Sequence, residues 1–161
     1  MMILESTRVS LRAFKESDLE NLRTLDTDPD IMKFTPAKIP QTLEQTKNRL
    51  MRYSKMDGVW AAELKNSKIF IGWFMLIPTE LEFPEIGFMI VKKYWGMGLA
   101  SEVAGAIIDH ALHILKHKGV AARTNIENHQ SISVLKKLQF LHVRNSVNSE
   151  NDELMIFLRT F

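Results

Sequence analysis

The chain has 161 residues, of which 45% are hydrophobic and 25% charged, and its formal net charge is +2. This length and composition predict one globular domain over residues 1–161, and the small charge gives no reason to expect nucleic acid or a membrane as a partner. Because the sequence has no cysteine, disulfide scaffolds, thiolate zinc sites and cysteine nucleophiles are excluded. The first residues lack the apolar run of a signal peptide, and no stretch approaches the roughly 20 apolar residues of a membrane span, so we expect a cytoplasmic protein.

The first third of the chain predicts one strand followed by helices. Apolar and polar residues alternate over residues 8–13, which is typical of a strand. Leucines recur at helical spacing over residues 19–25, and Asp28-Pro29 breaks that helix and could start another turn. Residues 42–45 have the pattern of a capping box, which predicts the start of a further helix. The residues of that helix expected to face inward are Leu43, Leu50 and Met51.

Three strand candidates follow, separated by turn residues. They cover residues 59–64, 69–77 and 81–91, and residues 66–67 and 78–79 mark the turns between them. The middle run is apolar at nearly every position, whereas a strand with one solvated face alternates. The pattern therefore predicts a central strand that is covered on both faces.

The second half predicts a long helix, a short helix and three strands. The long helix follows a glycine turn, and its apolar stripe runs from Leu99 to Leu115. The expected strands cover residues 120–125, 140–144 and 154–159, the short helix covers about 131–138, and a polar loop covers 145–152. The order β α α β β β α β α β β predicts an α/β (α+β) fold with a mixed sheet and helices on both faces.

Three histidines recur along the long predicted helix: His110, His113 and His117. They lie near one side of the helix, away from its apolar stripe. A metal site is one reading of this spacing, with Asp109 as a neighbouring carboxylate. We interpret the histidines as part of a solvated helix face, and we expect no metal.

The most informative stretch, residues 86–102, runs from a strand through Gly96-Met97-Gly98 into the long helix. At such a junction several N–H groups have no intrahelical acceptor and carry partial positive charge, which suits a phosphate. A tight turn without a ligand is the alternative. A nucleotide-binding protein of another kind is disfavoured, because there is no Walker lysine and Ser101 stands where a dinucleotide fingerprint needs its third glycine.

A second stretch runs from Asn128 to Phe140, and by itself it describes a capped amphipathic helix leading into a strand. Together the two stretches resemble the Gcn5-related N-acetyltransferase (GNAT) family, most of all its RimJ/RimL-like branch, which acetylates ribosomal-protein N-termini. The residues that fill the first family pattern are Tyr94, Trp95, Gly96, Gly98, Ala100, Ser101 and Glu102. Those that fill the second are Asn128, Ser131, Val134, Leu135, Lys137, Leu138 and Phe140. Nearer the N-terminus, the residues that match are Arg8, Leu11, Arg12 and residues 28–32, so the resemblance covers nearly the whole chain.

The resemblance implies a mixed, mostly antiparallel, twisted sheet with a splayed pair of strands and helices on both faces. It also implies acetyl-CoA as cosubstrate. The coenzyme A diphosphate is then expected on the residues of the glycine turn and helix start, which are Trp95, Gly96, Met97, Gly98, Leu99, Ala100 and Ser101. The pantetheine arm is expected to pair with Phe88, Met89 and Ile90, where one amide faces the thioester oxygen. Asn128 and Ser131 are expected beside the arm and the sulfur.

The implied reaction is direct attack of a neutral amine on the thioester. Glu85 is the candidate general base, directly or through a water, because it shares a strand face with Gly87 and Met89. A solvent-exposed glutamate at the strand edge is the other reading of Glu85. Ser131 is the candidate general acid for the leaving thiolate.

The sequence departs from the family pattern at several positions, and three of these departures bear on the expected chemistry or on a turn. Leu135 stands where many members have a tyrosine, so a tyrosine acid is not available there. Met97 replaces a common lysine, which removes one positive charge near the phosphates. Gln139 replaces the glycine before Phe140, so we expect that turn to use a non-glycine geometry.

In the resembled family the acceptor lies between the early helices and the late-strand loop, which correspond to residues 27–43 and 144–152. The carboxylates in or beside these segments are Asp26, Asp28, Asp30, Glu150, Asp152 and Glu153. An acidic rim would suit a cationic amine, and a solvated loop is the other reading.

The sequence therefore predicts acetyl transfer from acetyl-CoA to a primary amine, either a protein N-terminal α-amine or a small molecule. The alternative is a non-catalytic acyl-CoA-binding module with the same fold. The partners expected are acetyl-CoA and the amine. A homodimer stays open, because the sequence does not determine the oligomeric state.

Overall fold

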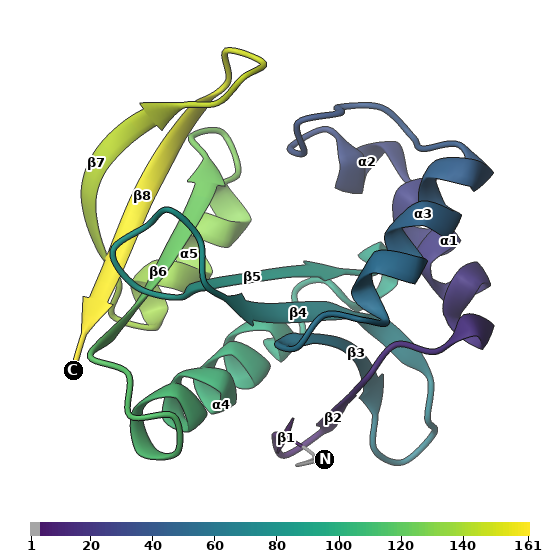
Figure 1. The fold of residues 1–161 in the computed structure, drawn as a ribbon, viewed down its shortest axis with the longest axis horizontal. Helices are drawn as coiled ribbons and strands as arrows, with labels where there is room; N and C mark the ends of the chain where they lie inside the picture. Colours follow the sequence, from purple (N-terminus) through teal and green to yellow (C-terminus); the bar gives the residue numbers. More distant parts are fainter. Residues whose placement is uncertain (1–3) are drawn as a thin grey trace.

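The computed structural model describes residues 4–161, in which eight strands form one twisted sheet in the order β1-β2-β3-β4-β5-β6-β8-β7 (Figure 1). Neighbouring strands are antiparallel, except that β5 and β6 are parallel. The strands are β1 (Leu4–Glu5), β2 (Val9–Arg12), β3 (Val59–Leu64), β4 (Phe70–Ile77), β5 (Glu85–Ile90), β6 (Gly119–Asn125), β7 (Leu141–Val147) and β8 (Glu153–Thr160). The helices are α1 (Leu19–Asp26), α2 (Pro29–Met32), α3 (Leu43–Tyr53), α4 (Leu99–His113) and α5 (His129–Lys137), with short 3₁₀ turns η1 (Glu16–Asp18) and η2 (Lys92–Tyr94). The predicted mixed, mostly antiparallel sheet is confirmed.

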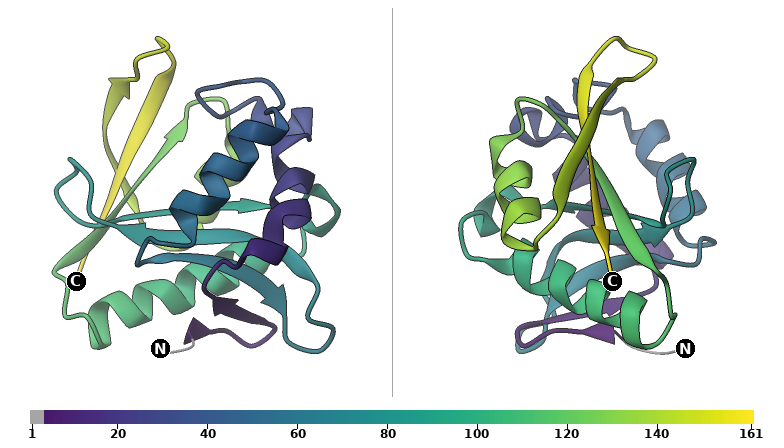
Figure 2. Two further views of the ribbon diagram at one scale, coloured as in Figure 1. Left: turned by 45° about the vertical axis from the view of Figure 1, so that its right-hand side comes forward. Right: turned by 90° about the vertical axis from the view of Figure 1, so that its left-hand side faces the viewer.

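Helices cover both faces of the sheet, as predicted. α4 lies against one face, and α1 and α3 lie against the other (Figure 2). The central strand β4 serves both cores. It places Phe74 and Leu76 in the core beneath α4, and Phe70 and Trp73 in the core beneath α1 and α3. None of the helices within residues 4–161 has both the length and the apolar character that crossing a bilayer requires.

The inward face of α3 differs from the prediction. Leu50 is buried, but Leu43 and Met51 are 46% and 54% exposed. The inward position one turn before Leu50 is Thr46, whose hydroxyl donates to the carboxylate of buried Asp26 at 2.8 Å. A threonine whose hydroxyl has a buried acceptor can occupy a core-facing position, and a reading based on apolar residues alone misses it.

Several predicted boundaries were also wrong, among them the start of the polar loop 145–152, because β7 extends to Val147. α4 ends at His113, so Leu115 lies beyond the helix and is 45% exposed. The chain turns before Gly119 because Lys116 itself adopts a left-handed φ of +57°. β5 begins at Glu85, and residues 81–84 form the loop before it.

The turn between α5 and β7 contradicts the expected non-glycine geometry, because Gln139 adopts the left-handed φ of +64°. Its N–H donates to the Lys136 carbonyl, and the next N–H, of Phe140, donates to the Leu135 carbonyl, both at 3.0 Å. This pair of bonds is the Schellman ending of a helix, which requires a left-handed residue just after the cap. Glutamine therefore takes the conformation for which glycine is suited.

Candidate functional site

β5 and β6 are paired at one point and then separate. Glu85 lies opposite Ala121 in the register, and the Ala121 N–H donates to the Pro84 carbonyl at 2.9 Å. Beyond this point β6 runs away from β5 together with β8 and β7 (Figure 1). We call this separation the splay. It is the splayed pair of strands that the resemblance implied.

The part of β5 beyond the pairing point directs main-chain groups toward the splay. The Val91 N–H donates to the Ile71 carbonyl at 2.9 Å. Because antiparallel pairing alternates, odd-numbered residues of this strand bond to β4 and even-numbered residues face away from it. The amides of Phe88 and Ile90 therefore face the splay, whereas the amide of Met89 bonds to β4. Of the three residues predicted to meet the pantetheine arm, two have free donors.

The glycine turn joins β5 to α4 and has the geometry that an anion requires. Gly96 and Gly98 have φ values of +73° and +77°. A Cβ at Gly96 would meet no atom within 4 Å, and one at Gly98 would meet only the Arg8 guanidinium, at 3.7 Å. Gly98 is the N-cap of α4 and supplies no side-chain cap. The first N–H groups of α4 are therefore left without a side-chain acceptor, beside open space.

All residues predicted to hold the diphosphate, 95–101, lie together in this turn and the first turn of α4. The turn is fixed to β5 by Trp95, whose indole N–H donates to the Ile90 carbonyl at 2.8 Å. This bond leaves the Ile90 N–H, and not its carbonyl, for a ligand in the splay. The sequence motif contains Trp95 but does not show this contact.

Arg8 braces the turn from the first hairpin. Its guanidinium donates to the Met97 carbonyl at 3.0 Å and to the Glu102 carboxylate at 2.7 Å. Glu102 also accepts from the Ser6 hydroxyl at 2.6 Å and from the Arg8 backbone N–H at 2.7 Å. Although its burial acts to raise the pKa, the bonds from Ser6 and Arg8 hold the pKa of Glu102 below its usual value. The family motifs include both Arg8 and Glu102, but the sequence did not predict that the two residues contact each other.

The second motif forms the start of α5, directly after β6. The Asn128 carboxamide oxygen accepts from the Ser131 N–H at 3.3 Å, which caps the helix. The Ser131 side chain is half-buried, and Leu135 lies in the core beneath α4 with 3% exposure. Asn128 and Ser131 are thus brought together on the β6 side of the splay, while Phe88 and Ile90 lie on the β5 side.

Glu85 is not an exposed residue at a strand edge, because it is only 4% exposed. Its two carboxylate oxygens accept from Arg123 at 2.8 and 2.7 Å. Arg123 comes from β6 and also pairs with Glu80 at 2.5 Å. The Glu85–Arg123 pair therefore ties β5 to β6 where the splay begins. Each oxygen of Glu85 therefore already accepts one bond from the Arg123 guanidinium.

The two segments expected beside the acceptor meet at one ion pair. Lys38, in the loop between α2 and α3, contacts Asp152, in the β7–β8 hairpin, with Nζ 2.5 Å from Oδ1. On the same side of the molecule, Asp30 of α2 pairs with Lys92 of η2. The sequence analysis singled out the carboxylates of these segments but did not predict that Lys38 and Lys92 pair with them.

One carboxylate expected on the acidic rim is not there. Asp26 is fully buried, and its carboxylate accepts from Arg49 at 2.7 Å and from the Thr46 hydroxyl at 2.8 Å. Asp28 also has a structural role, because its carboxylate caps α2 by accepting from the Asp30 N–H at 2.9 Å. Fewer carboxylates are therefore available to a ligand on this rim than the sequence suggested.

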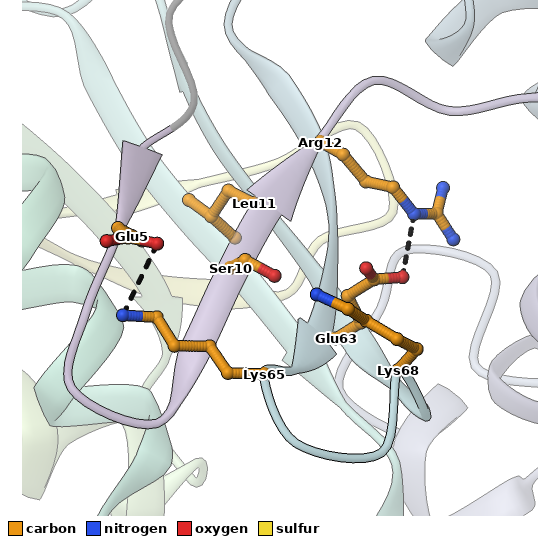
Figure 3. Close-up of a pocket in the computed structure, with 7 residues that line it drawn as sticks. All are labelled: Glu5, Ser10, Leu11, Arg12, Glu63, Lys65 and Lys68. Atoms are coloured by element: carbon orange, nitrogen blue, oxygen red, sulfur yellow. Dashed lines mark hydrogen bonds and ion pairs between the residues drawn. The ribbon is translucent and has the colours of Figure 1, made fainter.

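A shallow hollow lies elsewhere, on the outer strands β1 to β3 (Figure 3). Four of the charged groups that line it are paired with one another, Glu5 with Lys65 at 3.3 Å and Arg12 with Glu63 at 2.8 Å, and Lys68 lines it as well. No glycine turn or helix start lines it. Within residues 4–161, no three histidine, aspartate or glutamate side chains are grouped to hold a metal ion. The splay and the glycine turn are therefore the candidate site.

Comparison with known proteins gives consistent matches. A family model described as an acetyltransferase (GNAT) domain matches residues 8–141. The chain is 29% identical over 163 residues to the uncharacterized protein YkkB of Bacillus subtilis, which covers 97% of this chain and 94% of YkkB. A GNAT-family acetyltransferase structure from Bacillus anthracis has a TM-score of 0.89 at 23% identity and covers 99% of this chain and 98% of its own. Spermidine N-acetyltransferase from Vibrio cholerae, solved with CoA and spermine, has a TM-score of 0.79 at 16% identity and covers 96% of each chain.

Proposed function

The chain belongs to the acetyltransferase (GNAT) family, and on this premise we propose that it transfers an acetyl group from acetyl-CoA to a primary amine. In the proposed step, the amine nitrogen attacks the thioester carbon in a ternary complex. The new C–N bond replaces the C–S bond, the amine loses a proton, and coenzyme A leaves as a thiolate that is protonated. The matched residues, 8–141, include the glycine turn, the splay and α5.

The observation that carries the proposal is that free main-chain donors border the splay at two adjoining places. The N–H groups at the start of α4 have no side-chain cap, and the positions that a Cβ would fill at Gly96 and Gly98 face open space, which supports a diphosphate there. The amides of Phe88 and Ile90 continue this row along β5 and support an extended pantetheine arm that pairs as an added strand. One of these amides is proposed to stabilise the developing oxyanion of the thioester.

Glu85 and Ser131 have different proposed roles. Since Arg123 occupies both oxygens of Glu85, we assign Glu85 a positioning role that fixes β5 against β6. A role as general base, directly or through a water, is the alternative for Glu85, and a pH–rate profile of Glu85→Gln distinguishes the two. The Ser131 hydroxyl is proposed to donate to the leaving thiolate. Because a thiol has a pKa near about 8.5, thiolates leave readily and the contribution of such a donor is small.

The acceptor is proposed to be a primary amine, and two types have support. The resemblance to the RimJ/RimL-like branch supports a protein N-terminal α-amine. A pKa of roughly 7.7 to 8.0 makes such an amine a readier nucleophile at neutral pH than a lysine-like amine. The fold is also shared with an enzyme named for spermidine, which supports a small-molecule amine.

A thiol-release assay with acetyl-CoA tests the proposal. We expect release of coenzyme A to depend on an added amine when N-terminal peptides, monoamines and diamines are compared. The alternative is an acyl-CoA-binding module, which the closed Glu85–Arg123 pair and the buried Leu135 favour. Tight acetyl-CoA binding without turnover on any amine would establish that alternative and reject the enzyme.

A further inference from the structure

The Lys38–Asp152 ion pair joins segments that come from opposite sides of the splay. Lys38 belongs to the loop 33–42, which follows α2 on the side of α1 and α3. Asp152 belongs to the hairpin of β7 and β8, which continue the sheet beyond β6 (Figure 1). The Nζ to Oδ1 distance is 2.5 Å. An alkylammonium group thus already occupies one carboxylate at the place where the two sides of the splay meet.

Asp152 is held in position by its own hairpin, independently of Lys38. Its second oxygen, Oδ2, accepts from the Asn148 carboxamide at 3.0 Å, and its N–H donates to the Asn148 side-chain oxygen at 2.9 Å. A backbone bond from the Asn148 N–H to the Asp152 carbonyl, at 3.1 Å, closes the same turn. The Asp152 side chain is only 12% exposed. Oδ1 is therefore fixed as an acceptor before any ammonium group binds it.

Lys38 is held much less firmly. Its side chain is 48% exposed, and its φ of +61° is unfavourable for a residue with a side chain. No residue from 33 to 41 is buried, so the loop has no apolar anchor of its own. Only the Lys38 end of the pair is open to solvent, and ion pairs at the surface typically contribute about 0–1 kcal/mol. Another ammonium group can therefore replace Lys38 at little cost.

The charged side chains around the turn of the hairpin that carries Asp152 are all negative, which suits a cationic ligand. Residues 145–153 contain Glu150, Asp152 and Glu153 but no lysine or arginine. The bond from Lys38, followed by the bond from Asn148, lowers the pKa of Asp152 below its usual value, so the carboxylate stays ionised at neutral pH. The lysine side chain is itself a four-carbon chain ending in an ammonium group, which is the same chemical group as one end of a linear diamine.

We propose that Asp152 is a specificity-determining residue that binds the second, non-reacting ammonium group of a linear diamine or polyamine acceptor. In the free protein Lys38 occupies this position, and the acceptor displaces it. The inference rests on the proposed function, because it concerns the same site and deepens the acceptor class. It requires that substitutions of Lys38 and of Asp152 change KM for a dicationic acceptor in opposite directions.

The test compares linear diamines of three to six carbons with monoamines of the same length. For Asp152→Asn, which keeps the shape and removes the charge, we expect KM for the best diamine to rise about tenfold, the loss of one charge-assisted hydrogen bond. KM for the matched monoamine and kcat for both should stay within about twofold. For Lys38→Met, which keeps the alkyl chain, we expect KM for that diamine to fall, by about twofold to fivefold, because the internal competitor is gone.

Lys68→Met is the matched control, since Lys68 also has a left-handed φ, of +59°, and lies beside the distant hollow of Figure 3. Lys68→Met should change neither KM for the diamine nor KM for the monoamine. If Asp152→Asn and Lys38→Met shift KM in the same direction, the pair is a structural latch and the proposal is overturned. Equal effects of Asp152→Asn on diamine and monoamine would also overturn it.

Calorimetric titration of the diamines, with coenzyme A present, separates this inference from the proposed function. If no amine supports thiol release but diamines still bind more weakly to Asp152→Asn than to wild type, the proposed function fails and the ammonium site stands. If thiol release occurs but diamine affinity does not depend on Asp152, the function stands and this inference fails.

Discussion

Glu85 lies on β5 where that strand is paired with β6, and it is shielded from solvent. Its partner Arg123 lies 38 residues further along the chain, and Arg123 is held on its other side by Glu80, which is 70% exposed. Arg123 of β6 thus links Glu85 of β5 and Glu80 at the point where the two strands begin to separate. Removing the buried carboxylate of such a pair destabilises the fold, because the partly desolvated guanidinium is left without one of its acceptors.

Glu85→Gln should therefore lower the stability of the fold more than it changes the chemistry. We expect a loss in the free energy of unfolding toward the lower end of about 1–3 kcal/mol, because Arg123 is 31% exposed and solvent weakens the pair. We also expect a rise in KM for acetyl-CoA. The shape of the pH–rate profile should not change. Urea unfolding and steady-state kinetics measure these effects, with Glu80→Gln as the exposed control. Loss of the acidic limb of the profile would restore Glu85 as the general base.

Gly98 carries the clearest single-residue prediction for the cofactor. A side chain at this position points into open space near the Arg8 guanidinium, where the diphosphate is proposed to lie. Gly98→Asp should raise KM for acetyl-CoA at least about tenfold, because a carboxylate would face the phosphates. Gly98→Ala imposes the same left-handed strain without the charge, so its effect on KM should be much smaller. Equal KM values for wild type and Gly98→Asp would show that the diphosphate lies elsewhere.

At the scale of the element, the end of α5 shows a local conflict between sequence and backbone. The Schellman bonds from Gln139 and Phe140 require a left-handed residue at position 139. An L-residue with a side chain pays roughly 1–2 kcal/mol for that conformation. The fold keeps it because α5 must end there for Phe140 to be buried and for β7 to begin at Leu141.

Gln139→Gly should stabilise the protein. The relief of left-handed strain exceeds the added chain entropy of glycine, and we expect a net gain of about 0.5–1 kcal/mol and a Tm higher by roughly 1–4 °C. Gln139→Ala is the control, since alanine has the same strain as glutamine and should give no gain. Thermal unfolding followed by circular dichroism measures both variants. A Tm for the alanine variant as high as that of the glycine variant would contradict the strain argument.

At the scale of the whole molecule, two shielded carboxylates join the first hairpin to the rest of the fold. Asp18 is fully buried and accepts from the Arg12 guanidinium at 2.7 and 2.9 Å. Burial acts to raise its pKa, but the bonds from Arg12 and its other partners hold the pKa of Asp18 below its usual value. Glu102 receives its bonds from Ser6 and Arg8 in the same way. Folding therefore lowers the pKa of both groups.

The direction of these shifts predicts how stability depends on pH. A carboxyl whose pKa is lower in the folded state adds stability that is fully present above its unfolded pKa, near about 4, and is lost as pH falls through the folded value. We expect the free energy of unfolding contributed by these two groups to be constant from about pH 7 to pH 5 and to decrease below about pH 4. Urea unfolding at several pH values measures this decrease.

Glu102→Gln tests the share of one carboxylate. The variant should be less stable than wild type at pH 7, and its stability should decrease less steeply below about pH 4, because one linked proton is removed. Glu5→Gln is a suitable control, since Glu5 is 56% exposed and forms only a surface pair with Lys65. An acid slope for Glu102→Gln as steep as that of wild type would show that this carboxylate is not coupled to folding.

Except for β1 and the short helix α2, the order of the elements could be predicted from the sequence, as could the central apolar strand and the glycine turn before α4. Each of these follows from a property of neighbouring residues: side-chain periodicity, turn preference, or the freedom of glycine to adopt positive φ. The residues of the candidate cofactor site were predictable for the same reason, because residues 95–101 are consecutive and their donors are main-chain groups.

The partners of the charged side chains were decided only by the tertiary structure. Arg8 and Glu102 lie 94 residues apart in the sequence, and Lys38 meets Asp152 only because the sheet brings the β7–β8 hairpin near the α2–α3 loop. An ion pair depends on which elements are neighbours in space, and no local pattern encodes this. The sequence by itself therefore determined the main-chain half of the site. Packing of the sheet decided that Glu85 would be held by Arg123 and that an ammonium group would already lie on Asp152.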